Sequence, residues 1–317
     1  MKRCFQCMEE YEEGQEKCPV CGFFDQQEDG VWLEPGTILQ GRYIVGTFLY
    51  YMESDLLYIG WDALFSRKVL IQEFFPQFCS MRAGQGKLKV YDSKTEPFEA
   101  GKNIFIGVGL KLISLDDTPN LLNVFSVFEE NHTAYITMEY PGKTALWRDL
   151  ERWGCFDEED MLSLMEALSI PLKAAHEHQV FHGRISLDCC FISESGEYKL
   201  GCFQSARYVC TEQRADGERL ENPESRSDVY GLANLAGQVL FGEEVWNDSD
   251  IEERYELLEG LCSQAAADTL KRALSISPPD RPESVEVFCH QLSGKEKGVF
   301  ANTKKKSQRW KFWLSAW

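Results

Sequence analysis

The stretch from Val180 to Arg207 constrains the fold of this chain more than any other segment. It begins V-F-H-G-R-I-S-L-D-C-C-F-I and, after five residues, continues Y-K-L-G-C-F-Q-S-A-R. Its polar positions include Arg184, Cys189 and Cys202. A guanidinium is a permanently charged donor that cannot accept a proton, and a thiol is a poor ligand for Mg²⁺, which prefers hard oxygen atoms. These three residues therefore cannot support magnesium-dependent acid-base chemistry.

The same stretch resembles the catalytic centre of a protein kinase, in which H-R-D-x-x-x-x-N precedes D-F-G by about a dozen residues. His182 stands at the histidine of that motif. Arg184 replaces its aspartate, Cys189 its asparagine, and Cys202 the aspartate of D-F-G. The resemblance implies that His182 packs beside Phe203 as part of the structural frame. It also implies that the catalytic positions are degenerate.

A second group of motifs lies nearer the N-terminus. From Arg42, the sequence R-Y-I-V-G-T-F-L-Y-Y-M-E-S-D-L-L-Y-I-G-W-D resembles the first two strands of a bacterial serine/threonine kinase of the Hanks type. Backbone amides can approach nucleotide phosphates only where side chains do not intervene, so the family keeps glycines between these strands. The corresponding positions here hold larger residues, namely Tyr50, Met52, Glu53 and Asp55.

The next expected strand, V-L-I-Q-E-F-F-P, resembles the V-A-I-K-E-F-F-P variant of one bacterial kinase group. Gln72 replaces its lysine, and an amide can donate to a phosphate but cannot neutralise it. Lys68 is the nearest cation, placed just outside the strand, and we do not expect it to substitute. The following helix should supply a glutamate partner for the lysine, but Val108 or Gly109 occupies that position.

Residues 157–179 show the apolar spacing of a long amphipathic helix that leads to His182. Further along, S-D-V-Y-G-L resembles the start of the central helix of the large kinase lobe, and Asp228 would tie down the catalytic-loop backbone. P-P-D-R-P-E-S resembles a late loop of the family, in which Arg281 would pair with Glu224 at the end of a short activation segment.

Four cysteines near the N-terminus have the spacing of a metal site. They form two C-x-x-C knuckles, made of Cys4 with Cys7 and Cys18 with Cys21. Two such turns can supply the four thiolates of a closed tetrahedral zinc site, which leaves no open position for catalysis. The alternative is that these are redox-active or simply buried cysteines. Gly22 and the polar residues between the knuckles favour a structural zinc ribbon.

The motifs define the expected domain boundaries. We expect a zinc ribbon over residues 1–24, a linker over 25–39, a kinase-like domain over 40–294 and a basic, Trp-rich tail over 295–317. The kinase-like domain should have an α+β, two-lobed fold. Its small lobe is expected over 40–140 and its large lobe over 141–294.

Charge is distributed unevenly along the chain. The net charge is −18, yet the last 23 residues carry seven Lys or Arg and one acid. The acidic body argues against nucleic acid as a partner, because phosphate contacts need clustered cations. Basic residues and tryptophans over 304–317 suit peripheral contact with an anionic membrane, although a terminus without fixed structure is equally compatible.

No secretory h-region opens the sequence and no run of eighteen apolar residues occurs in it. Four of the twelve cysteines are assigned to zinc and the others are scattered. Both features predict a reduced, cytoplasmic location, with membrane association only through the tail.

The sequence predicts a pseudokinase that acts as a protein-binding or scaffolding module in bacterial signalling. Its protein partner is not identified by the sequence. Structural zinc is expected as a cofactor, whereas ATP and magnesium are not. The alternative is an atypical serine/threonine kinase that transfers phosphate from ATP to protein. Such an enzyme would have to use Asp188, Lys68 or Asp55.

Overall fold

A computed structural model describes residues 1–24, 30–204 and 224–294. By its internal contacts the chain divides into two compact units. Among the described residues, the N-terminal unit comprises Met1–Asp116, Leu122–Tyr140 and Gln204, and the C-terminal unit comprises Asp117–Leu121, Pro141–Phe203 and the residues from 224 onward. The predicted tail, part of the predicted linker and the predicted activation segment lie outside the described residues.

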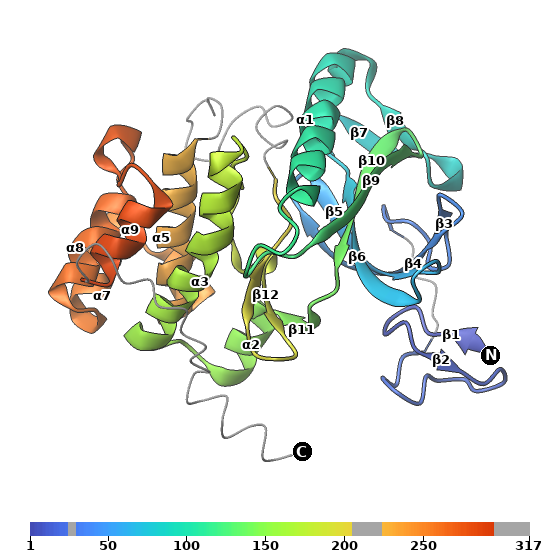
Figure 1. The fold of residues 1–317 in the computed structure, drawn as a ribbon, viewed down its shortest axis with the longest axis horizontal. Helices are drawn as coiled ribbons and strands as arrows, with labels where there is room; N and C mark the ends of the chain where they lie inside the picture. Colours follow the sequence, from blue (N-terminus) through green and yellow to red (C-terminus); the bar gives the residue numbers. More distant parts are fainter. Residues whose placement is uncertain (25–29, 205–223, 295–317) are drawn as a thin grey trace. The chain divides into compact units, whose positions relative to one another are not determined.

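The N-terminal unit is built on a six-stranded antiparallel sheet with the order β3-β4-β5-β6-β10-β9 (Figure 1). These strands are β3 (Ile38–Leu39), β4 (Tyr43–Met52), β5 (Asp55–Asp62), β6 (Arg67–Phe74), β9 (Val124–Glu130) and β10 (Thr133–Glu139). Two small hairpins and one helix complete the unit: β1 (Lys2–Arg3) with β2 (Glu10–Tyr11), β7 (Ser80–Arg82) with β8 (Leu88–Val90), and α1 (Thr95–Ile113). Short 3₁₀ turns occur at Gly84–Gly86 and Asp92–Lys94.

The central strands of this sheet are buried almost along their whole length. In β5, β6 and β10, apolar, aromatic and β-branched residues dominate, as expected for strands covered on both faces. Helix α1 packs on β9 and β10, and the rings of its Phe98 and Phe105 lie 5.4 and 5.5 Å from the ring of Phe74 at the end of β6. A Cβ at Gly109 would lie only 2.7 Å from Val127, so this glycine permits the close approach of helix and strand.

The described part of the predicted linker packs against the same sheet. The ring of Trp32 stacks on Phe48 at 4.7 Å, and Leu33 is buried, with its N–H donating to the Tyr58 hydroxyl at 3.1 Å. Trp32 and Leu33 therefore anchor this segment to the sheet, whereas Val31 and Glu34 beside them are exposed.

A buried ionic network lies within the N-terminal unit. The Glu73 carboxylate is fully buried and forms a two-pronged ion pair with Arg82, with N–O distances of 2.7 and 2.5 Å. It also accepts hydrogen bonds from the hydroxyls of Tyr58 and Tyr135, both at 2.7 Å. Burial, together with the charge of Glu73, raises the pKa of both tyrosines well above their usual value. Each polar group of the network is thus satisfied without water.

The C-terminal unit is mainly helical. Its helices are α2 (Leu146–Trp153), α3 (Glu158–Glu177), α5 (Ser225–Phe241), α6 (Glu243–Asp248), α7 (Ile251–Leu261), α8 (Gln264–Ala273) and α9 (Val285–Leu292). A three-stranded sheet is formed by β11 (Gly142–Ala145), β12 (Cys190–Ser193) and β13 (Tyr198–Leu200), with 3₁₀ turns at Leu187–Cys189 and Pro278–Asp280. Within the described residues, no helix combines the length and apolar character needed to cross a bilayer.

Helix α5 is the centre of the C-terminal unit. It contacts α3, α6, α8 and α9, which explains why nearly all of its faces are apolar. Trp246 of α6 packs flat over Gly237, where any side chain would overlap its indole, and the indole N–H donates to Asn234 at 2.9 Å. The amphipathic helix expected over 157–179 corresponds to α3, which is capped by the Asp157 carboxylate accepting from the Asp160 N–H.

The buried ion pair gives a stability prediction. Arg82→Met should lower the free energy of unfolding by about 3–5 kcal/mol, because it leaves the buried Glu73 carboxylate without its counter-charge. Arg82→Met combined with Glu73→Gln should lose less than Arg82→Met alone, since no unpaired charge then remains. Urea unfolding followed by circular dichroism would measure both, and additive losses in the double variant would contradict the predicted coupling.

Candidate functional site

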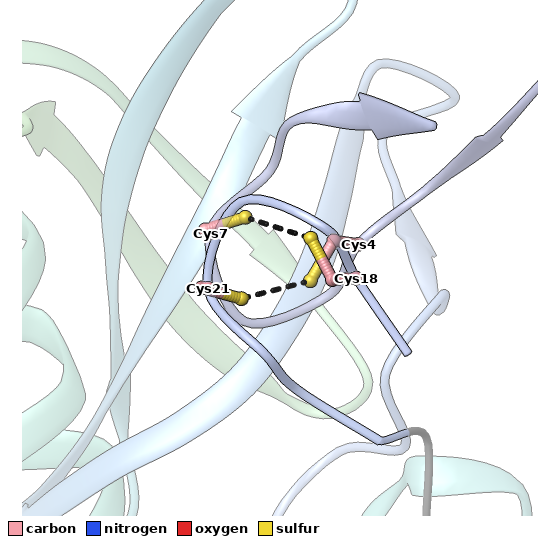
Figure 2. Close-up of side chains that lie close together, drawn as sticks. All are labelled: Cys4, Cys7, Cys18 and Cys21. Atoms are coloured by element: carbon pink, nitrogen blue, oxygen red, sulfur yellow. Dashed lines mark hydrogen bonds between the residues drawn. The ribbon is translucent and has the colours of Figure 1, made fainter. Parts of the chain in front are cut away.

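The four N-terminal cysteines converge in the structure. Their Sγ atoms all lie within 4.8 Å of one another, with Cys4 and Cys21 at 3.6 Å and Cys7 and Cys18 at 3.7 Å (Figure 2). A tetrahedral zinc site with Zn–S bonds of about 2.3 Å places its sulfur atoms about 3.8 Å apart. The side chains point inward from both knuckles, so the donor set and its spacing fit a four-thiolate metal site.

The two knuckles share one backbone geometry. Met8 N–H donates to the Cys4 carbonyl and Gly22 N–H to the Cys18 carbonyl, both at 2.8 Å. Met8 (φ 61°) and Gly22 (φ 75°) are both left-handed, which glycine adopts freely and methionine does not. Burial acts to raise the pKa of Cys18, but hydrogen bonds from the backbone of Cys21 and Val20 outweigh it and lower the pKa to about 7. Burial instead raises the pKa of Cys4 and of Cys7, so among these three ligands the thiolate, the form that binds metal, is stabilised only at Cys18.

The β4–β5 hairpin occupies the position of the glycine-rich turn and is filled with side chains. Met52, Ser54 and Asp55 are buried at its tip, and Phe75 N–H donates to the Ser54 carbonyl at 2.7 Å. The Gln72 amide donates to the Asp55 carboxylate at 3.0 Å, and both side chains are fully buried. A carboxylate thus stands beside the residue that would have to contact a phosphate.

Lys68 lies within β6, not outside the strand as the sequence suggested. Its ammonium group is 2.7 Å from the carboxylate of Glu9. Glu9 belongs to residues 1–24, which contain the four cysteines and are called the cysteine module below. Burial acts to lower the pKa of Lys68, but the hydrogen bond and charge of Glu9 outweigh it and raise the pKa. This cation is therefore committed to an intramolecular ion pair.

In the C-terminal unit, Asp228 binds the backbone of the loop that carries His182. Its carboxylate accepts from the N–H of His182 at 2.8 Å and from that of Gly183 at 3.0 Å. The Nε2 of His176 lies 2.7 Å from the same carboxylate. His176 was not singled out from the sequence, where its only signal is its place in the last turn of the helix that leads to the loop. The imidazole of His182 contacts the ring of Phe203, with 4.6 Å between centroids.

Arg184 and Asp188 form an ion pair with an N–O distance of 3.6 Å. Burial raises the pKa of Asp188, and the Arg184 charge offsets only part of that effect. Glu243 lies close enough that the charge of Asp188 adds to burial in raising the pKa of this second carboxyl group. The one acid left in the loop is therefore held by the guanidinium that replaces the motif's aspartate.

Both positions that would hold metal carry buried thiols. Cys189 donates its S–H to the Arg184 carbonyl at 3.4 Å, and burial raises its pKa to about 11, so the thiol is neutral at pH 7. Cys202 is buried and has φ 56°, a left-handed conformation that costs a non-glycine residue about 1–2 kcal/mol. Cys202 therefore adopts a strained backbone conformation, and its thiol is a poor ligand for magnesium.

The expected pair of Arg281 and Glu224 involves the late loop and the residue that precedes α5. Arg281 donates to the carbonyls of Ser275 at 2.7 Å and Ile276 at 3.0 Å. Glu224 is exposed at the N-cap of α5, and the contacts described for these residues do not join it to Arg281. Arg226 instead links α5 to the late loop, donating to the Pro279 carbonyl at 2.7 Å.

Comparisons with known proteins agree with this arrangement. The family model "Protein kinase domain" matches residues 108–293. Aurora kinase B of Danio rerio is 24% identical over 181 residues, which cover 51% of this chain and 57% of that kinase. The chain thus spans little more than half the length of this curated relative.

Two solved structures share the fold at low identity. "PpkA-294 apo form" has a TM-score of 0.66 at 22% identity, with 83% of this chain and 100% of that chain covered. The kinase domain of PknI from Mycobacterium tuberculosis has a TM-score of 0.59 at 17% identity, with coverage of 83% and 99%. These matches confirm the predicted α+β, two-lobed kinase-like fold.

The contacts of Asp228 predict how strongly the loop depends on it. Asp228→Asn should lower the free energy of unfolding by about 2–3 kcal/mol, because the amide NH₂ would face an N–H donor where a carboxylate oxygen now accepts. Asp280→Asn, at an exposed position, is the matched control and should stay within about 0.5 kcal/mol of the unmodified chain. Equal unfolding midpoints in urea for the two variants would contradict the prediction.

Proposed function

The chain belongs to the protein kinase domain family, and from that premise we propose that it is a pseudokinase, a binding module that does not transfer phosphate. The observation that carries the proposal is the buried hydrogen bond between Gln72 and Asp55. It puts a carboxylate next to the residue that replaces the phosphate-binding lysine. The Gln72 amide is held by Asp55 and carries no charge that could neutralise a phosphate.

The other catalytic positions support the same proposal. Arg184 cannot act as a base, and the nearest acid, Asp188, is paired with it. Loss of a positioned base costs about 10²- to 10⁴-fold in rate, and loss of one electrostatic stabiliser about 10²- to 10³-fold. Such losses do not add simply. Because the base, the phosphate-binding lysine and both metal ligands are replaced together, no route to ordinary phosphoryl transfer remains.

A binding role follows from what the chain retains. Asp228 holds the loop backbone, His182 packs on Phe203, and the core of each unit is closed. This frame can present surfaces to another protein without any reaction. We therefore assign the chain a protein-binding or scaffolding role in signalling, and we assign zinc to the four cysteines as a structural ion.

The nucleotide prediction tests the pseudokinase directly. A ligand at 100 times its Kd adds about 2.7 kcal/mol to stability, which would raise the melting temperature by several degrees. We expect no such shift with ATP, magnesium or both, and no incorporation of radioactive phosphate. A shift that needs magnesium, together with labelling that Asp188→Asn abolishes, would instead identify an atypical kinase.

The zinc prediction concerns metal content and pH. The chain should carry about one zinc ion, measured by mass spectrometry of the metal, and Cys18→Ser should lose most of it. Zinc should be released as pH falls, because the ligands bind as thiolates and protons compete with the metal. Cys262→Ser is the control for removal of a thiol outside the cluster and should keep its zinc. Equal zinc content in the two variants would rule out the site.

A further inference from the structure

The cysteine module is bonded to the main sheet through a bulge in β4. The pairing of β4 with β5 shifts register between Val45 and Phe48, so the N–H of Thr47 is turned away from the ladder. It donates instead to the carbonyl of Phe5, between the two cysteines of the first knuckle, at 2.8 Å. The bulge thus gives the sheet a backbone donor that the knuckle satisfies.

Gly46 makes this approach sterically feasible. A Cβ at that position would overlap both the Met8 side chain and the Phe5 carbonyl. Gly46 is buried in the middle of a strand, where glycine is normally unfavourable because it is flexible and packs nothing. The absence of a side chain at Gly46 therefore allows the first knuckle to pack directly against the backbone of β4.

Side chains extend the contact across the next two strands. The Arg3 guanidinium lies 3.8 Å from the centre of the Trp61 ring, and Glu9 pairs with Lys68 at 2.7 Å. Trp61 and Lys68 face each other in the register of β5 and β6. The module therefore contacts β4, β5 and β6. Asp55 lies in β5, Gln72 lies in β6, and β4 is the other strand of the hairpin that ends at Asp55.

The module has very little core of its own. Its buried cluster consists of Cys4, Tyr11 and Cys18, with Cys7 and Phe23 partly buried against it. Two of the three buried members are metal ligands, so the folded module depends on the ion. Removing the ion would release the knuckle that satisfies Thr47 and pairs with Lys68.

We propose that the metal-loaded module is a brace for the β4–β5–β6 sheet, so that zinc binding at the four cysteines controls the order of the β4–β5 hairpin. This inference rests on the zinc site of the proposed function. Coupling between two sites is reciprocal, so docking on the sheet must also strengthen zinc binding. Coupling of ordinary size changes affinity about 5- to 150-fold.

Hydrogen exchange of the full-length chain, with zinc bound and after chelation, tests the brace. In the unmodified protein, chelation should speed exchange of the Thr47 amide and of peptides covering residues 43–62. Gly46→Val should show fast exchange there with or without zinc, and its zinc affinity should fall about 5- to 150-fold. Gly84→Val is the matched control, because a Cβ at Gly84 meets nothing within 4 Å, and it should respond to chelation like the unmodified chain.

A charge exchange keeps the test independent of damage to the strand. Glu9→Lys and Lys68→Glu should each weaken zinc binding and reduce the effect of chelation on the hairpin. The double variant should restore both, because the ion pair is rebuilt in reverse. Failure of the double variant to recover would overturn the contact as a source of coupling.

The outcomes separate this inference from the proposed function. If the chain binds zinc but exchange over residues 43–62 is unchanged by chelation, the brace is wrong and the zinc site stands. If the unmodified chain takes up no zinc, the assignment of zinc fails first and the brace fails with it. Absence of phosphoryl transfer would be unaffected by either result.

Discussion

The Asp228 carboxylate sets the geometry of the loop that carries His182, Arg184 and Asp188. It accepts two backbone N–H groups, and a third contact from His176 fixes its own orientation. These bonds involve the backbone of the loop and His176 of α3, and none involves a side chain of the loop. The loop can therefore keep its path when its reactive residues change. Because buried carboxylates need such donors, Asp228 and the loop backbone depend on each other.

The replaced residues bond to the protein itself. Gln72 donates to Asp55, Arg184 pairs with Asp188, and the thiol of Cys189 donates to the backbone. In an enzyme these positions would leave polar groups ready for a nucleotide, metal or hydroxyl group. Here each of these groups has a partner within the protein, as buried polar groups generally require. The contacts on which the proposed loss of catalysis rests therefore also stabilise the fold.

The sequence predicts features that depend on local spacing. The two knuckles, the long helix starting at Asp157 and the registers of the kinase-like motifs all follow from residues close together in the chain. Pairs that join distant segments carry no such pattern. The bond between Asp55 and Gln72 needs the register of β5 on β6, and the pair Glu9–Lys68 needs the docking of one module on another. Because β6 begins at Arg67, two residues before the expected strand, Lys68 lies inside the strand and not outside it.

The buried side chains of the β4–β5 hairpin and the contacts of the cysteine module with the sheet both bear on the stability of the same strands. A kinase hairpin that binds nucleotide is stabilised by its ligand whenever ligand is present, because binding to the folded state adds to stability. If Asp55 and the neighbouring Gln72 of β6 prevent nucleotide binding, as proposed, the hairpin lacks this contribution. The contacts of Phe5, Glu9 and Arg3 with the sheet supply stabilisation from within the chain. The module that makes them has almost no apolar core, so under the proposed zinc assignment metal binding would supply the free energy that holds these contacts in place.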